Sequence, residues 1–325
     1  KVDNSTIWKV SYVDTIGYHM VGHGWGCRWR LTVDGVPTPY FGSHTQANVG
    51  WRIMPYSMTW YLPNIAAGQH TLRIQLDRPD GGTASECLAG WPSGDTANFI
   101  SAEEIPANQI AIVRNMTDRR DTPGGWADLP DRVVTYNKTS ANTRLDVRLM
   151  DVLGYHMNGG HSWGCRWRLT MDGNVVGRPY SSHTTPGSGW RIYPRELSWL
   201  LDGVGAGNHT FRIQVNRPDP NSTSECLAGW PNGEVGNTFV VQERDTAGTA
   251  IAANFADTRQ TPGGWETLAG RSVSLVKANA NTAIRITYQD DIGYHGVGHG
   301  WGCRWRVLID GAVGTQPENS HTSTR

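Results

Sequence analysis

A long internal repeat constrains this chain more than any other feature of its sequence. The string GYHMVGHGWGCRWRLTVDG at 17–35 returns as GYHMNGGHSWGCRWRLTMDG at 154–173 and as GYHGVGHGWGCRWRVLIDG at 293–311. The cysteine of the string stands at Cys27, Cys165 and Cys303, so successive copies are 138 residues apart. A unit of that length can hold its own hydrophobic core, unlike the roughly 20–50-residue units of solenoid proteins.

The repeat predicts three domains along the chain. Lys1 aligns with Lys138 and Lys277, and the SHT motif recurs at 43–45, 182–184 and 320–322. We therefore expect copy one at 1–109 without its front, a complete copy two at 110–248, and copy three at 249–325 without its back. On this interpretation the sequence is part of a longer chain.

Charge and composition exclude several classes of partner. The chain has 29 basic and 29 acidic residues, so we expect neither nucleic acid nor an anionic membrane as a partner. No apolar run approaches the roughly 18 residues of a membrane-spanning helix. Gly reaches 39 and Trp 15, which is typical of turn-rich β proteins.

Alternating apolar residues predict strands at matching places in the copies. One is expected around Trp8, Val10 and Tyr12, with counterparts at 145–149 and 284–288, and another runs from Cys27 to a DG turn. Further strands are expected at 72–76 and 211–215, and at the closing segments NFISAEE and TFVVQE. Short strands between turns predict an all-β fold of tandem antiparallel β-sandwich, or jelly-roll, domains.

The cysteine spacing predicts one disulfide in each domain. Cys27 and Cys87 stand 60 residues apart in copy one, and Cys165 and Cys226 stand 61 apart in copy two. We expect these two pairs to be bonded and Cys303 to await a partner beyond Arg325, which indicates a secreted, extracellular protein. Five Asn-x-Ser/Thr sequons suggest a glycoprotein, at Asn4, Asn115, Asn137, Asn208 and Asn221.

Several of these segments together resemble one known family. NTRLDVRL, GCRWRLTMDG, SHT, GAGNHTFRIQV, ECLAGW and FVVQE occur in copy two in an order similar to the C-terminal globular domain of collagen triple helix repeat-containing protein, a relative of C1q/tumour necrosis factor jelly rolls. The resemblance implies a ten-strand jelly roll, an extracellular location and trimerisation. It also implies a role in binding or in the extracellular matrix, without catalysis. Two departures are the lack of a Gly-X-Y stretch and the tandem arrangement, so packing between copies of one chain could replace a trimer of separate chains.

No pattern points to catalysis or to a cofactor. The sequence contains no GxSxG elbow, HExxH helix or phosphate loop, so we expect no enzyme, no catalytic residue and no cofactor. Histidines recur three per copy, and His19, His23 and His44 would make a zinc or copper site if they converged. The first two are four residues apart in copies one and three but five apart in copy two, so packing of loop histidines on aromatic rings is preferred and no metal is expected.

Two functions remain open at this point. The preferred one is a structural or adhesive extracellular protein that assembles through its repeats, in the form of a filament if the contact between copies does not close. The alternative is a lectin with a tryptophan-lined glycan site in each repeat. The GYH and GWG segments are the expected assembly or ligand surface, with candidate residues Tyr18, His19, Trp25, Tyr155, His156, Trp163, Tyr294, His295 and Trp301.

Overall fold

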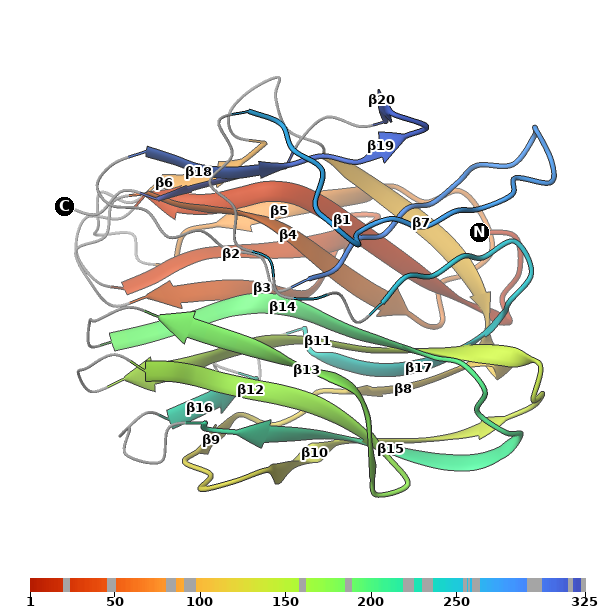
Figure 1. The fold of residues 1–325 in the computed structure, drawn as a ribbon, viewed down its shortest axis with the longest axis horizontal. Coiled ribbons are helices and arrows are strands. Elements are labelled where there is room, and N and C mark those ends of the chain that lie inside the picture. The colour runs from red at the N-terminus through yellow and green to blue at the C-terminus, as the bar shows by residue number, and fades with distance from the viewer. Residues whose placement is uncertain are drawn as a thin grey trace.

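The structure is a computed structural model in which the regular elements are almost entirely β-strands (Figure 1). It describes residues 1–19, 24–45, 51–79, 86–90, 98–157, 162–184, 189–218, 225–229, 236–253, 256, 258, 264–290, 300–314 and 318–322. Among these residues the helical content is one short 3-10 turn, η1 (Ala107–Gln109). None of the described segments forms an apolar helix of membrane-spanning length.

Copy two is an antiparallel β-sandwich of two sheets. Its strands are β8 (Ile110–Arg114), β9 (Arg119–Asp121), β10 (Ala127–Lys138), β11 (Thr143–Met157), β12 (Ser162–Met171), β13 (Asn174–Thr184), β14 (Gly189–Leu201), β15 (Gly207–Asn216), β16 (Glu225–Ala228) and β17 (Thr238–Asp245). One sheet has the order β10-β15-β12-β13. In the other, β11 pairs with β14, β16 and β17, while β9 and β8 extend it at β16 and β17.

Period-two alternation explains the core between the two sheets. Cys165, Trp167 and Leu169 of β12 are fully buried, as the sequence predicts for the inward face of a strand. They belong to one apolar cluster with the inward residues of β11 in the opposite sheet, which are also fully buried, namely Leu145, Val147 and Leu149. The outward Arg166 and Arg168 alternate with the buried residues of β12.

The DG turns have the geometry of tight hairpins. Asp34, Asp172 and Asp310 have φ values of 52°, 51° and 51°, and the glycines that follow them also have positive φ. Two successive residues with positive φ define a type I′ turn, for which Asp-Gly is a favoured pair because it tolerates that backbone conformation. The sequence therefore sets the hairpin after the cysteine strand in each copy.

Copy one repeats the pairing of copy two among the strands that both copies show. Its strands are β1 (Thr6–His19), β2 (Gly24–Val33), β3 (Val36–Thr45), β4 (Trp51–Leu62), β5 (Leu72–Asp77), β6 (Glu86–Ala89) and β7 (Phe99–Pro106). Strand β1 pairs with β4, β6 and β7, as β11 pairs with β14, β16 and β17.

Copy three departs from the expected pattern. Its described strands are β18 (Gly300–Trp305), β19 (Leu308–Ile309), β20 (Ala312–Val313) and β21 (Glu318–Thr322). The strand predicted at 284–288 is not formed, and Ile284, Ile286 and Tyr288 are 46%, 47% and 39% exposed. The described residues of copy three include no counterpart of β4, β6 or β7, the strands that pair with the matching segment in copy one.

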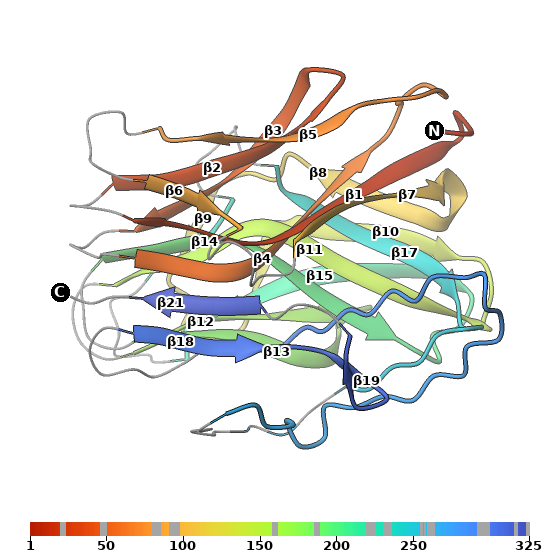
Figure 2. The same ribbon diagram turned by 90° about the horizontal axis from the view of Figure 1, so that it is seen from above.

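Sheets continue from one copy into the next. Strand β3 of copy one pairs with β14 of copy two, which joins β5-β2-β3-β14-β11-β16-β9 into one sheet (Figure 1). Strands β17 and β8 lie off this path and bring the sheet to nine strands, since β17 pairs with β11 and β8 pairs with β17. Strand β21 of copy three pairs with β4 of copy one, within a sheet that runs β18-β21-β4-β1-β6 (Figure 2). The contacts between copies are therefore made partly through backbone hydrogen bonds.

Candidate functional site

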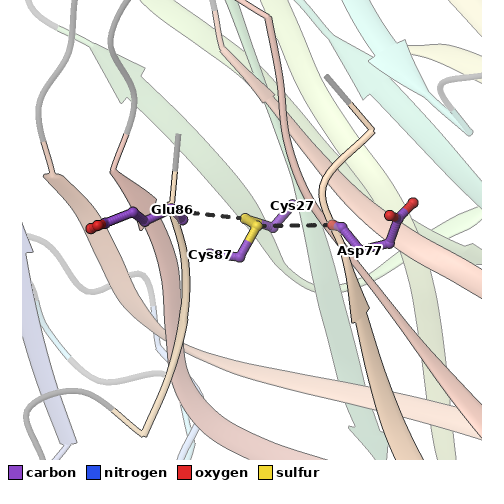
Figure 3. Close-up of a disulfide and its surroundings, with 4 residues drawn as sticks. All are labelled: Cys27, Asp77, Glu86 and Cys87. Atoms are coloured by element: carbon purple, nitrogen blue, oxygen red, sulfur yellow. Dashed lines mark hydrogen bonds between the residues drawn. A yellow bond between two sulfur atoms is a disulfide. The ribbon is translucent and has the colours of Figure 1, made fainter. Parts of the chain in front are cut away.

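Copies one and two each contain one disulfide, which joins the two sheets of that copy. Cys27 on β2 is bonded to Cys87 on β6, with the Cα atoms 5.7 Å apart (Figure 3). Cys165 on β12 and Cys226 on β16 form the same bridge in copy two, also with 5.7 Å between the Cα atoms. These are the pairings that the spacing predicts. Cys303 is partly buried, and burial raises the pKa of its thiol.

In copies one and two the aspartate of the DG turn forms a hydrogen bond with the histidine near the start of a later strand. Asp34 Oδ2 lies 2.6 Å from His70 Nδ1, and Asp34 Oδ1 accepts a hydrogen bond of 2.8 Å from the Thr71 backbone N–H. Asp172 and His209 form the same contact in copy two at 2.7 Å. The hydrogen bond to Asp34 raises the pKa of His70. These pairs connect a turn to the start of the next strand.

The glutamate of the closing strand binds the chain segment that precedes the first long strand. In copy two, Glu243 accepts hydrogen bonds from Tyr136 Oη at 2.8 Å and from the Thr139 and Ser140 backbone N–H groups at 3.0 Å each. Burial alone would raise the pKa of Glu243, but the hydrogen bonds from Thr143, Thr139 and Tyr136 lower it to about 2. Its counterpart Glu104 is held by Thr6 and Val2, so both glutamates have a structural role.

A buried polar cluster lies where copies one and two face each other. Glu196 on β14 accepts hydrogen bonds of 2.9 Å from both Ser57 and Thr59, which belong to β4. On its other side Glu196 pairs with Arg148, whose Nε also donates to Asp146 at 2.8 Å. Burial alone would raise the pKa of Glu196, but Arg148 and Lys9 beside it lower that pKa. The carboxylate is thus bound by groups from both copies.

Lys9 is the member of this cluster without a hydrogen-bond partner among the described residues. Its side chain is 1% exposed, and its Nζ makes no hydrogen bond there. Burial, together with the nearby Arg148, lowers the pKa of the Lys9 ammonium to about 7. An amine in this position changes its charge near neutral pH, inside the contact between copies.

Apolar side chains of copies one and two also pack against each other, in two clusters. One cluster combines residues of copy one with residues of copy two, namely Tyr61, Ile105 and Ile7 with Ile110, Val240 and Ile112. The core cluster around Trp8 and Val10 also includes Met150, Val152, Ile192 and Leu227 of copy two. The two copies therefore share buried apolar surface, which is the main source of stability in a permanent contact.

Glu103 joins all three copies at one point. Its Oε1 lies 3.6 Å from Arg244 Nη2 of copy two, and its Oε2 lies 3.1 Å from Arg285 Nη1 of copy three. In the repeat alignment Arg285 stands at the position of Lys9 and Asp146. One equivalent position thus carries a charged residue in every copy, and all of them lie at contacts between copies.

The expected GYH and GWG surface is described only in part. Tyr155 is 5% exposed and packs in the core of its own copy, and His156 Nδ1 lies 3.3 Å from Glu225 Oε2 of the same copy. The other candidate side chains lie outside the described residues, namely Tyr18, His19, Trp25, Trp163, Tyr294, His295 and Trp301. For Tyr155 the structure shows a core position.

The candidate metal ligands fall on side chains that the structure does not describe, namely those of His19, His23 and His44. Among the residues that are described, no group of three His, Cys, Asp or Glu side chains could hold a metal ion.

An arginine and a tryptophan form a second recurring surface feature. Arg168 lies over the ring of Trp126 in copy two, 4.1 Å from the ring centroid, and Arg306 lies over Trp265 in copy three at the same distance. Trp265 is 45% exposed. In both copies the tryptophan belongs to a TPGGW segment.

Four of the five sequon asparagines lie on the described surface. Asn4, Asn115, Asn137 and Asn208 are exposed, while Asn221 lies outside the described residues. Asn137 on β10 stands directly opposite Asn208 on β15 in the strand register. These two asparagines therefore share one face of the sheet.

Comparisons with known proteins identify no relative. No protein-family model and no curated protein sequence matches the chain. Solved structures with weak similarity include dimeric latent PorU from Porphyromonas gingivalis, at 10% identity and a TM-score of 0.26 over 77% of this chain and 25% of that one. Others are the insecticidal delta-endotoxin Cry8Ea1 from Bacillus thuringiensis, at 9% identity and 0.22 over 74% and 53%, and infectious bursal disease virus strain Gx, at 10% and 0.22 over 75% and 63%.

The chain spans less than two thirds of each of these three structures. None of these comparisons tests the resemblance to the collagen triple helix repeat-containing family, which stays a prediction.

Sequence reasoning expects contacts between copies but misses the residues that form them. Outward residues such as Lys9 and Asp146 have the pattern of a solvated strand face, and the structure buries them instead. The Arg148 side chain between them and Glu196 is 13% exposed. One sign of this was present in the sequence, because the position of Lys9 carries Asp146 and Arg285 in the other copies. Opposite charges at equivalent positions favour contact between unlike copies.

Proposed function

We propose that this chain belongs to a secreted structural or adhesive protein that works through the assembly of its repeats and not through catalysis. The observation that carries the proposal is the polar cluster of Glu196, in which a buried carboxylate of copy two is bound by Ser57 and Thr59 of copy one. Removing such groups from water is costly unless both partners stay in place. A contact with such a buried polar cluster is expected between copies that stay permanently associated.

Disulfides and exposed sequons support an extracellular setting for this role. One bridge per sandwich is typical of proteins that fold in oxidising compartments. The four exposed asparagines are placed where a glycan can be carried without entering the core. Both features suit a protein that persists outside the cell.

Charge reversal at the contact tests the assembly. Glu196→Lys places a cation beside Arg148 and Lys9, so copies one and two should unfold in two separate transitions where the parent chain shows one. Asp202→Lys is the matched control, because Asp202 is 60% exposed and its ion pair with Arg144 lies within copy two. A single transition in the Glu196→Lys variant would contradict the role of this contact.

The native material tests the structural role itself. Negative-stain microscopy of protein from its source should show particles or filaments of many repeats in regular contact. Isolated repeats without mutual contacts would count against a structural protein.

Glycan binding is a second candidate, favoured by the recurring Trp126–Arg168 and Trp265–Arg306 pairs. An exposed indole face stacks on sugar rings, and an arginine beside it can donate to hydroxyl groups. A glycan array compares the parent chain with Trp126→Ala and Trp265→Ala variants. Specific binding by the parent that both substitutions remove would support the lectin.

A further inference from the structure

One arginine recurs in each copy on the outward face of the strand that carries the cysteine. It is Arg30 on β2, Arg168 on β12 and Arg306 directly after β18, at a spacing of 138 residues. Among the described residues, the contacts of these three guanidinium groups are with neutral side chains. The position therefore carries a positive charge in every copy without an ion pair among the residues that the structure describes.

A glutamine holds this arginine in copies one and two. Arg30 Nε donates to Gln75 Oε1, and Arg168 Nε donates to Gln214 Oε1, both at 2.8 Å. Gln214 is oriented in turn, because its Nε2 donates to Asp128 Oδ1 at 2.8 Å. The strands that carry Asp128, Gln214 and Arg168 are the neighbours β10, β15 and β12 of one sheet (Figure 1). The glutamine thus fixes the guanidinium through Nε, and the two Nη groups of Arg168 make no hydrogen bond among the described residues.

A tryptophan holds the same guanidinium from one face in copies two and three. Arg168 lies over Trp126 and Arg306 lies over Trp265, each 4.1 Å from the ring centroid. The ring attracts the cation and keeps its plane in place. Because Trp265 is 45% exposed, part of its indole remains open to a ligand beside the arginine.

No carboxylate compensates the charge of Arg168. Burial lowers the pKa of its guanidinium, and no acidic group raises that pKa again. Arg271 shows the contrast, because burial alone would lower its pKa but the hydrogen bond to Asp290 raises it. Arg168 is therefore a fixed cation with two unused donor groups, which is an arrangement prepared for an oxyanion.

We propose that these arginine sites bind an acidic polysaccharide whose sugars carry carboxylate groups. The proposal rests on glycan binding, the second candidate function above, and names the class of glycan. The carboxylate accepts two parallel hydrogen bonds from Nη1 and Nη2 of the arginine, and the sugar ring lies against the indole beside it.

The recurrence of the site favours a polymer over a small anion. A single exposed guanidinium binds one carboxylate weakly, because water competes for both groups. A polymer that engages two copies of the site gains affinity, since its second contact forms within the same complex. Nucleic acid fits less well than a polysaccharide, because the chain has a formal net charge of zero and Asp128 lies next to the site.

A pair of matched polysaccharides tests the class of ligand. The 325-residue chain should bind polygalacturonate, and it should bind the methyl ester of that polymer about tenfold more weakly, because the ester keeps the sugars and loses the charge. Binding of the acid should weaken as sodium chloride is added.

Three outcomes of this measurement count against the proposal. Equal binding of acid and ester overturns the acidic class but leaves glycan binding standing. Binding of neither polymer overturns the proposal, and the glycan array then decides separately whether the chain is a lectin. Tighter binding of single-stranded DNA than of polygalacturonate overturns it in favour of nucleic acid.

Lysine variants test whether the arginine fork matters beyond its charge. Arg168→Lys combined with Arg306→Lys keeps the charge but removes the planar pair of donors, so binding of polygalacturonate should weaken about tenfold. Arg212→Gln is the control on the same sheet face of copy two, because Arg212 is 44% exposed and already lies 3.7 Å from Asp128. This control should change the affinity less than about twofold. Unchanged binding by the lysine variant, or an equal loss in the control, overturns the site.

Discussion

Arg132 and Asp151 form an ion pair from which solvent is fully excluded. The Arg132 Nη2 and Nε atoms donate to Asp151 Oδ2 at 3.0 and 3.2 Å, and both side chains are 0% exposed. The pair connects β10 to β11 inside copy two. Copy three has a matching pair, Arg271 and Asp290, at 3.1 Å.

Neutralising Asp151 should be costly, whereas neutralising its counterpart in copy one should not. Asp151→Asn leaves the Arg132 charge buried and uncompensated, so we expect copy two to lose about 3–5 kcal/mol of unfolding free energy. Asp14 is bound by Tyr12 and the Gly90 N–H, without an ion pair among the described residues. Burial raises the pKa of both carboxyls, so the two variants differ in the arginine that only Asp151→Asn leaves uncompensated. Asp14→Asn should therefore be neutral or stabilising at pH 7.

Urea unfolding of the two variants at pH 7 measures this difference. Equal losses in both variants would contradict the role assigned to Arg132.

Lys9 should make stability depend on pH above neutrality. Its pKa is lowered to about 7 in the folded chain, against 10.5 when exposed, so the unfolded chain binds more protons between these values. Stability should then rise as pH increases from 7 toward 10.5. Lys9→Met should remove that rise and stabilise the contact between copies at pH 7.

Lys138→Met is the control for the Lys9 variant. Lys138 is also buried, but its Nζ donates to Thr143 Oγ1 at 3.0 Å and to the Ser140 carbonyl, so its removal should destabilise at every pH. Unfolding curves recorded across this pH range measure both variants. A rise that persists in Lys9→Met would show that another group causes it.

The elements inside each copy are predictable because their causes are local. Alternation places Cys165, Trp167 and Leu169 on one face, and Asp-Gly sets the hairpin that follows them. The cysteine spacing then identifies the bridge between sheets. The segment 284–288 has the same alternation yet forms no strand, because a strand also needs neighbours to pair with.

The contacts between copies depend on residues far apart in the sequence, so no local pattern shows them. Ser57 and Glu196 are separated by 139 positions and meet only because β4 and β14 lie face to face. Tyr155, expected on an assembly surface, belongs to a core. A segment that recurs with little change within one chain therefore does not distinguish packing from assembly.

The disulfides should contribute strongly to stability. Removing the Cys165–Cys226 bridge by a double change to alanine should cost about 4 kcal/mol, because it closes a loop of 61 residues in the unfolded chain. Cys303→Ala is the control and should change unfolding little. Non-reducing peptide mapping checks the pairing directly, and a peptide that joins Cys27 to Cys165 would refute it.

The histidine set should not bind a stoichiometric metal. Elemental analysis of the purified chain should show well below one zinc or copper per repeat, because the spacing of the first two histidines differs between copies. A value near one would instead support the site at His19, His23 and His44. Their substitution by alanine would then have to abolish the bound metal.

Asn137 and Asn208 should compete for glycans when the chain passes through a secretory pathway. They stand opposite each other on β10 and β15, and side chains in such a pair have Cβ atoms about 4.5–5.5 Å apart. Two branched glycans attached that close would collide, so a single chain should carry one or the other. Asn137→Gln should therefore raise occupancy at Asn208, and Asn208→Gln should raise it at Asn137. Asn115 provides the control, because neither change should alter its occupancy. Intact-mass and glycopeptide spectrometry measure all three sites, and chains that carry both glycans as often as independent occupancy predicts would contradict the competition.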